Sequence, residues 1–194
     1  LGDAADTVGA SIEVYSQSWC PPLLDIATNN PGKRPSCRTF MTSALNDVAS
    51  NRAIDTVILF AEWANYTEGQ RWGDNTASFY TDAFSSHESH SENTAVFRRS
   101  LLRTVKLLNE AGKRIVIVGP VPEYNLSVPE YLGKNYFLDQ QDSIPNKHLV
   151  SIETYQQRNR DVLDAFELKE VSSKVHYIDP FIYFCKSAFC DYRD

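Results

Sequence analysis

Short apolar runs alternate along the chain with longer segments in which apolar residues recur at helical spacing. Residues 57–61 form an uninterrupted apolar run, typical of a parallel strand covered on both faces. The pattern predicts strands at residues 12–15, 56–60, 115–118 and 175–179, and helices at residues 40–49, 94–111 and 151–170. Strands that alternate with amphipathic helices indicate βαβ units, so we expect an α/β fold with a mainly parallel sheet.

We expect the predicted elements to form one domain that spans residues 1–194. A chain of 194 residues with 42% apolar and 23% charged residues lies near the globular average and is long enough for one sizeable core. Two stretches, at residues 67–93 and 125–147, have no clear periodicity. Both are longer than ordinary connections between elements.

Polar and aromatic side chains follow two of the predicted strands. The strand at 56–60 is followed by one group and the strand at 115–118 by another, and together they are Glu62, Trp63, Asn65, Tyr66, Glu123 and Tyr124. The carboxyl ends of parallel strands meet at one edge of a sheet, where open α/β sheets bind ligands. We therefore expect these residues to line one substrate-binding cleft.

Charge and hydropathy exclude some classes of function. The net charge is −6 and the sequence has no basic run, so a partner with a phosphate backbone is not expected. No apolar segment approaches the roughly 20 residues that a membrane-spanning helix needs. The chain begins without a basic and then apolar leader, so we expect any export signal or membrane anchor to lie outside it.

The four cysteines fall into two close pairs, Cys20 with Cys37 and Cys185 with Cys190. The first pair brackets a segment rich in loop-forming residues, which a covalent bond would constrain. Neither pair has the Cys-x-x-Cys spacing of a zinc site. Two disulfides are favoured over a metal site, and they indicate an oxidising compartment such as the periplasm or the cell exterior.

Histidines offer no clear alternative metal site. His87 and His90 lie close together in a polar segment, but no third ligand is evident in the sequence. We expect no metal and no cofactor.

Five segments, taken in order, carry a resemblance to a known family. They are residues 2–3, 16–22, 57–66, 116–122 and 177–185. In order and spacing they resemble the periplasmic SGNH domain that is fused to membrane acyltransferases of the acyltransferase-three family. The resemblance spans nearly the whole chain.

The resemblance implies a fold, an activity and partners. Such domains are flavodoxin-like three-layer α/β/α sandwiches. The fused proteins O-acylate, usually O-acetylate, bacterial surface polysaccharides such as the O-antigen of lipopolysaccharide. The implied partners are a polysaccharide acceptor and an acyl-donating integral-membrane module, with the domain tethered to the inner membrane on the periplasmic side.

The family's catalytic residues are not matched in full. In the family, the nucleophilic serine follows Gly-Asp, but here Ala4 follows Gly2 and Asp3. Only eight residues separate Asp3 from the predicted strand at residue 12, too few for the helix that should follow the nucleophile. The family's Asp-x-x-His should follow the last cysteine pair, and we expect it beyond Asp194. Either segments near residue 4 and after residue 194 are missing from the sequence, or the site is degenerate.

The resemblance also points to candidate oxyanion contacts. Residues 16–18, including Ser18, occupy the region of a family glycine, and Trp63 stands where the family has an asparagine. The indole N–H of Trp63 is a donor, so it could replace the asparagine amide, or the ring could form a wall for a sugar. The residues that line the predicted cleft are expected to lie close to Asp3. The alternatives to an acyltransferase are a non-catalytic carbohydrate-binding or docking module, and a carbohydrate esterase.

Overall fold

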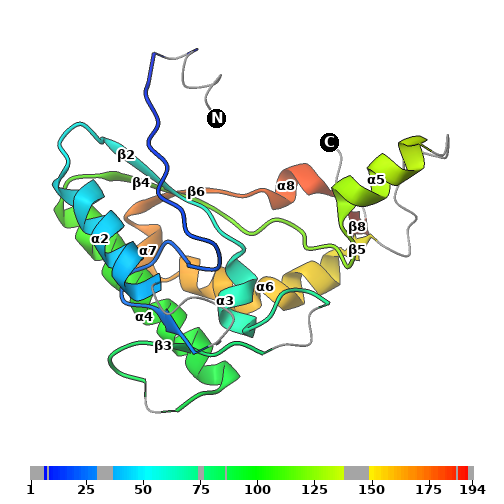
Figure 1. Ribbon diagram of the computed structural model, residues 1–194, viewed down its shortest axis with the longest axis horizontal. Coiled ribbons are helices and arrows are strands. Elements are labelled where there is room, and N and C mark those ends of the chain that lie inside the picture. The colour runs from blue at the N-terminus through cyan, green and yellow to red at the C-terminus, as the bar shows by residue number, and fades with distance from the viewer. Residues whose placement is uncertain are drawn as a thin grey trace.

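A computed structural model describes residues 7, 9–29, 37–73, 77–85, 87–137, 149–186 and 188–191 (Figure 1). The candidate residues Asp3 and Ala4 lie outside these ranges. In chain order, the elements are β1 (Ala27–Thr28), α2 (Cys37–Ser50), β2 (Thr56–Leu59), α3 (Trp63–Glu68), β3 (Tyr80–Thr81), α4 (His90–Glu110), β4 (Arg114–Val118), α5 (Val128–Phe137), β5 (Val150–Ser151), α6 (Ile152–Phe166), α7 (Lys169–Ser172), β6 (Val175–Ile178), α8 (Phe181–Phe184), β7 (Cys185–Lys186) and β8 (Phe189–Cys190).

The central sheet is parallel and has the strand order β2-β4-β6. Val57 pairs with Ile115, and Ile117 pairs with Tyr177. Short antiparallel pairs lie at its margins, β1 with β3 and β8 with both β5 and β7. The predicted α/β class with a parallel sheet is confirmed.

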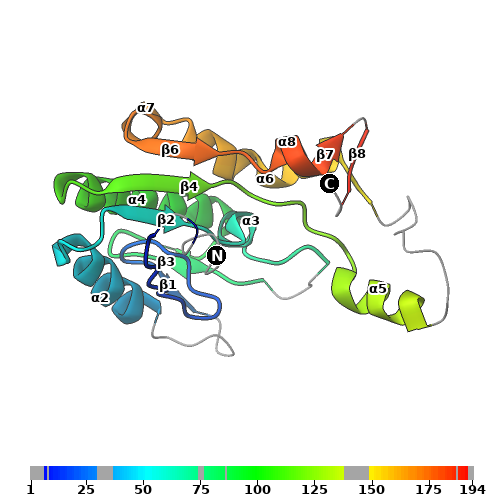
Figure 2. The same cartoon turned by 90° about the horizontal axis from the view of Figure 1, so that it is seen from above.

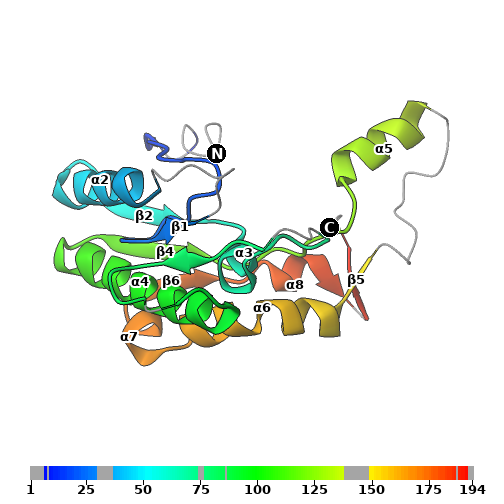
Figure 3. The ribbon, with the colours of Figure 1, turned by 60° about the horizontal axis from the view of Figure 1, so that its bottom comes forward.

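One face of the central sheet carries the main core. Val57, Leu59, Ile115 and Ile117 are buried there, together with apolar residues of α4 such as Leu108. Figures 2 and 3 show α4 running along the sheet, with α6 and α7 beside it.

The opposite face of the sheet is covered less completely. Ile58 and Phe60 are 57% and 59% exposed. The apolar run at residues 57–61 predicted burial on both faces, and for the described residues this was wrong. An apolar run shows that a strand can be buried on both faces, but it does not show what covers each face.

The predicted helices are present with shifted ends. α4 begins at His90, where the Ser89 side chain accepts a hydrogen bond from Glu92 N at 3.1 Å. Its polar first turn hides this start in the hydropathy pattern. Gly112 adopts a φ of 72° just after α4, as expected of a residue that ends a helix. The predicted helix at 151–170 is divided into α6 and α7, because Leu168 has an extended backbone.

Two regions differ more clearly from the prediction. The strand predicted at residues 12–15 is wrong, because this segment forms no ladder and leaves Val14 75% exposed. The aperiodic stretches contain regular elements. The stretch at 67–93 includes the end of α3, β3 and the first residues of α4, and the stretch at 125–147 includes α5. Figures 1 and 3 show α5 projecting away from the central sheet.

Candidate functional site

A cleft of about 410 Å³ lies at the carboxyl end of β2. Its walls come from the loop before β1, from α2, from the end of β2, and from α3 with the loop that follows it. The lining residues are Tyr15, Ser16, Gln17, Ser18, Trp19, Cys20, Pro22, Met41, Phe60, Ala61, Glu62, Asn65, Tyr66 and Arg71. The predicted residues Ser18, Glu62, Asn65 and Tyr66 are thus brought together at the predicted edge of the sheet.

Trp63 is not part of the cleft wall, so its predicted role in oxyanion or sugar binding is corrected. Its side chain is 0% exposed and packs edge-on against Phe97 and Phe166, with centroid distances of 6.1 and 5.4 Å. Its indole N–H donates to Val118 O at 2.7 Å. Because α3 begins at Trp63, the side chain turns inward under the carboxyl ends of β2 and β4.

Glu62 and Arg71 form an ion pair at the cleft. Arg71 Nε donates to Glu62 Oε2 at 2.8 Å, and Arg71 Nη2 donates to Glu62 Oε1. The hydrogen bonds that Arg71 donates to Glu62 hold the pKa of Arg71 above its ordinary value. The Arg71 guanidinium also lies over the Trp19 ring, 4.8 Å from its centroid, so one guanidinium connects the loop before β1 with the start of α3.

Asn65 and Tyr66 form the deeper wall. Asn65 is 1% exposed, and among the described residues its buried Oδ1 has no hydrogen-bond partner. Burial raises the pKa of Tyr66, and its ring packs edge-on against Tyr80 at 5.4 Å. Tyr66 is therefore a neutral phenol at physiological pH and is unsuited to act as a base.

The loop that carries Ser18 and Trp19 is held by a covalent bond. The predicted disulfide Cys20–Cys37 is present and joins this loop to the first residue of α2. Trp19 adopts a left-handed backbone with a φ of 69°. Residues other than glycine rarely adopt this region, and when they do the surrounding structure must hold them there.

Glu123 and Tyr124 follow β4 at the same sheet edge but do not line the cleft. Glu123 Oε2 accepts hydrogen bonds from Trp72 N at 3.0 Å and from Arg158 Nη2 at 2.8 Å. Tyr124 Oη donates to Cys190 O at 3.4 Å. Their predicted place on the cleft wall is corrected, because each instead binds a segment that passes this edge.

Arg158 was missed from the sequence. It is 8% exposed, donates from Nη2 to Gln70 O at 2.6 Å, and lies 5.6 Å from the centroid of the Trp72 ring. It stands on the inner face of α6 where an apolar residue is expected, and a charge on an apolar face was the available signal.

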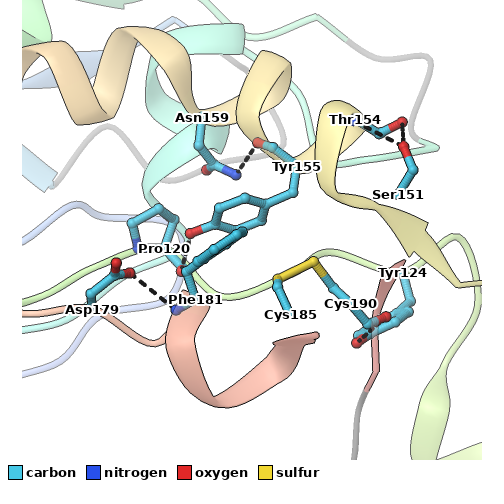
Figure 4. The surroundings of a disulfide bond; sticks show 10 residues. All are labelled: Pro120, Tyr124, Ser151, Thr154, Tyr155, Asn159, Asp179, Phe181, Cys185 and Cys190. Carbon is cyan, nitrogen blue, oxygen red and sulfur yellow. Dashed lines mark hydrogen bonds between the residues drawn. A yellow bond between two sulfur atoms is a disulfide. The ribbon is translucent and has the colours of Figure 1, made fainter. Parts of the chain in front are cut away.

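The second predicted disulfide, Cys185–Cys190, is also present. It closes the β7–β8 hairpin, and Figure 4 shows it beside Tyr155 and Phe181. Tyr155 Oη donates to Pro120 O at 2.9 Å, and its ring lies 5.2 Å from that of Phe181. This cluster links the hairpin to α6 and to the segment after β4.

The described ranges contain no group of three or more His, Cys, Asp or Glu residues that could hold a metal ion. No helix within them is long and apolar enough to cross a membrane. His87 and His90 are exposed, and the described lining of the cleft includes no histidine.

Comparison with protein-family models gives one match. The model described as "SGNH domain (fused to AT3 domains)" matches residues 1–194. No curated protein and no solved structure gives a significant match. The family is acyltransferase-associated and esterase-like, and the two disulfides fit an extracytoplasmic domain attached to a membrane module. With a parallel α/β sheet and a cleft at its carboxyl edge, this chain belongs to the family of SGNH domains fused to AT3 domains.

Proposed function

We propose that the domain takes part in the O-acylation, in the simplest case the O-acetylation, of a bacterial surface polysaccharide such as lipopolysaccharide O-antigen. The match of residues 1–194 to SGNH domains fused to AT3 domains carries this proposal. The acyl group comes from the membrane acyltransferase module, and the acceptor glycan binds in the cleft beside Glu62 and Arg71. The two disulfides favour the periplasmic side of the inner membrane for this reaction.

The chemistry of such a domain is acyl transfer through a serine ester. The serine oxygen attacks the acyl carbonyl, a histidine takes the hydroxyl proton, and the donor group leaves with that proton. A sugar hydroxyl then attacks the acyl-serine, which gives the sugar ester and regenerates the serine. In this sequence the nucleophile position is Ala4, which has no oxygen to carry the acyl group.

Ala4 also favours a second candidate function. A domain without a nucleophile at this position can still bind the glycan and present its hydroxyl to the membrane module, as a non-catalytic carbohydrate-binding module does. A carbohydrate esterase is the corresponding hydrolytic alternative, in which water replaces the sugar hydroxyl as the second nucleophile.

The intact gene product, with its membrane module, provides the test. It would be produced in cells that lack other O-acyltransferases, and the alkali-labile acetyl esters on the extracted polysaccharide would be counted by NMR. The proposal predicts esters that disappear when the SGNH domain is deleted. Equal ester content with and without the domain would contradict it, and a gain of hydrolysis on pre-acetylated glycan would identify the esterase.

Ala4→Ser separates the catalytic route from the binding role. An increase in ester content with Ala4→Ser supports transfer through an acyl-serine. Full ester content that Ala4→Ser leaves unchanged supports direct transfer from the membrane module to a glycan held by this domain.

A further inference from the structure

The charges in the cleft cancel. Among the described lining residues, Glu62 and Arg71 are the ones that carry a full charge at neutral pH, and they are paired through two hydrogen bonds. An anionic ligand would have to compete with the Glu62 carboxylate for Arg71 and would lie beside a like charge. The cleft is therefore better suited to an uncharged ligand.

The ion pair still offers hydrogen bonds to such a ligand. A guanidinium has five N–H donors and a carboxylate has about four lone-pair sites, so the two bonds between Arg71 and Glu62 leave several of each. The side chains of Arg71 and Glu62 are 48% and 46% exposed. Neighbouring hydroxyls on a sugar ring can thus bond to both residues, one as a donor and the other as an acceptor, without breaking the pair.

The rest of the lining suits a sugar as well. Trp19 and Phe60 provide aromatic surface for the apolar face of a pyranose ring, and Ser16 and Ser18 provide hydroxyls. Asn65 also lies in this wall, but its Oδ1 is buried and so contributes no acceptor to the cleft.

Arg71 is positioned by contacts outside the cleft. Its neighbours on both sides are fixed through Arg158, which donates to Gln70 O, and through Glu123, which accepts from Trp72 N. Gly69 begins this loop with a φ of 75°, and a Cβ there would lie 2.7 Å from Asn93 Nδ2. The backbone of residues 69–72 is thus held on both sides of Arg71, so that its side chain reaches Glu62 and Trp19.

We propose that Trp19, Glu62 and Arg71 form a subsite for one uncharged pyranose ring of the acceptor. This inference rests on the proposed function and deepens it, because it names the class of sugar. The ring stacks at Trp19, and two of its hydroxyls bond to the Glu62–Arg71 pair. A ring that carries a carboxylate is disfavoured.

The test uses the chain as it is and two matched probes, methyl β-glucoside and methyl β-glucuronide, which differ only in the oxidation state of C6. Titrations are followed by NMR shifts of the tryptophan indole N–H signals, with the Trp19 signal assigned from a Trp19→Phe variant. We expect a saturable shift at Trp19 with the glucoside, and about tenfold weaker binding of the glucuronide, the scale of one hydrogen bond to a charged group.

Two variants complete the experiment. Arg71→Gln is expected to weaken glucoside binding about tenfold while leaving the thermal midpoint nearly unchanged, because an exposed ion pair contributes little to stability. Arg114→Gln, at the amino end of β4 and outside this lining, should change neither glucoside binding nor the thermal midpoint. Tighter binding of the glucuronide, or glucoside binding that leaves the Trp19 signal unmoved, would overturn the subsite.

A failure of the proposed subsite can be distinguished from a failure of the proposed function. The titration needs no acyl transfer, so glucoside binding at Trp19 in a domain whose deletion leaves ester content unchanged would retain the subsite and reject the acyl-transfer role. The opposite result, domain-dependent esters with no binding at Trp19, would retain the role and reject the subsite.

Discussion

Arg158 and Glu123 form an ion pair of 2.8 Å, and the same Glu123 oxygen accepts the backbone N–H of Trp72 at 3.0 Å. The Arg158 side chain is 7% exposed. A carboxylate in the segment after β4, a guanidinium on α6 and the loop after α3 are therefore joined next to the cleft. Glu123 acts on the candidate site through this loop, since it is not among the residues that line the cleft.

Replacing Arg158 with methionine is expected to lower the free energy of unfolding by about 3 kcal/mol, because Glu123 would remain partly buried without its cation. Glucoside binding should weaken as well, since Gln70 O loses its hydrogen bond from Arg158 and the Trp72 ring loses the guanidinium beside it. Urea unfolding and the NMR titration measure the two effects. The double variant Arg158→Met, Glu123→Gln should recover part of the lost stability, and a double variant less stable than the single one would contradict this account.

Trp63→Ala is expected to destabilise the fold by about 4 kcal/mol, the range for removing a large buried aromatic side chain. Trp63→Phe keeps an aromatic ring between Phe97 and Phe166 and should cost less, because it loses mainly the hydrogen bond to Val118 O. Thermal and urea unfolding are the measurements. A Trp63→Ala domain with an unchanged midpoint and weaker glucoside binding would return Trp63 to the cleft.

The main strands and helices were predictable because their apolar residues have a regular period and one buried face. Residues 115–118 and the apolar stripe of α4 are examples. The strand predicted at 12–15 failed because four residues of suitable composition do not form a strand unless a neighbouring strand pairs with them. Sequence composition carries no information about that neighbour.

The candidate site was predicted in position but less well in detail. Glu62, Asn65 and Tyr66 line a cleft at the expected edge. Trp63 lies between them in the sequence yet points into the core, because consecutive residues in a helix point in directions about 100° apart. Arg71 and Arg158 were missed because their roles depend on contacts across 9 and 35 residues of sequence, with Glu62 and Glu123 respectively. A local pattern cannot reveal such contacts.

Thiol titration of the unfolded, unreduced protein should detect no free cysteine, since all four are paired in the structure.

Replacing Cys20 and Cys37 with serine should lower the free energy of unfolding by about 3 kcal/mol on the chain-entropy model for a loop of this length. Glucoside binding should fall too, because the loop that carries Ser18 and Trp19 is released. The control is the corresponding serine pair at Cys185 and Cys190, which lies outside the cleft lining and should leave binding unchanged. Equal loss of binding in both double variants would contradict a local role for the first disulfide.

The Asp82 side chain is 0% exposed and is paired with Arg99 and Arg103 at 2.9 Å each. Burial alone would raise its pKa, but hydrogen bonds from Arg99, Arg103 and the backbone N–H of Phe84 outweigh burial and hold the pKa well below its ordinary value.

A carboxyl group whose pKa is lower in the folded than in the unfolded state stabilises the fold above the unfolded pKa, which is about 3.9 for Asp. This stabilisation is lost as the pH falls below that value towards the folded pKa. The free energy of unfolding should therefore decrease between about pH 5 and pH 3, and Asp82→Asn should have lower stability at pH 7 and a flatter pH profile in this interval. Asp164→Asn, which removes an exposed partner 3.9 Å from Arg98, serves as the matched control and should keep the slope of the unmodified protein. An Asp82→Asn profile parallel to that of the unmodified protein would show that other carboxyl groups cause the acid sensitivity.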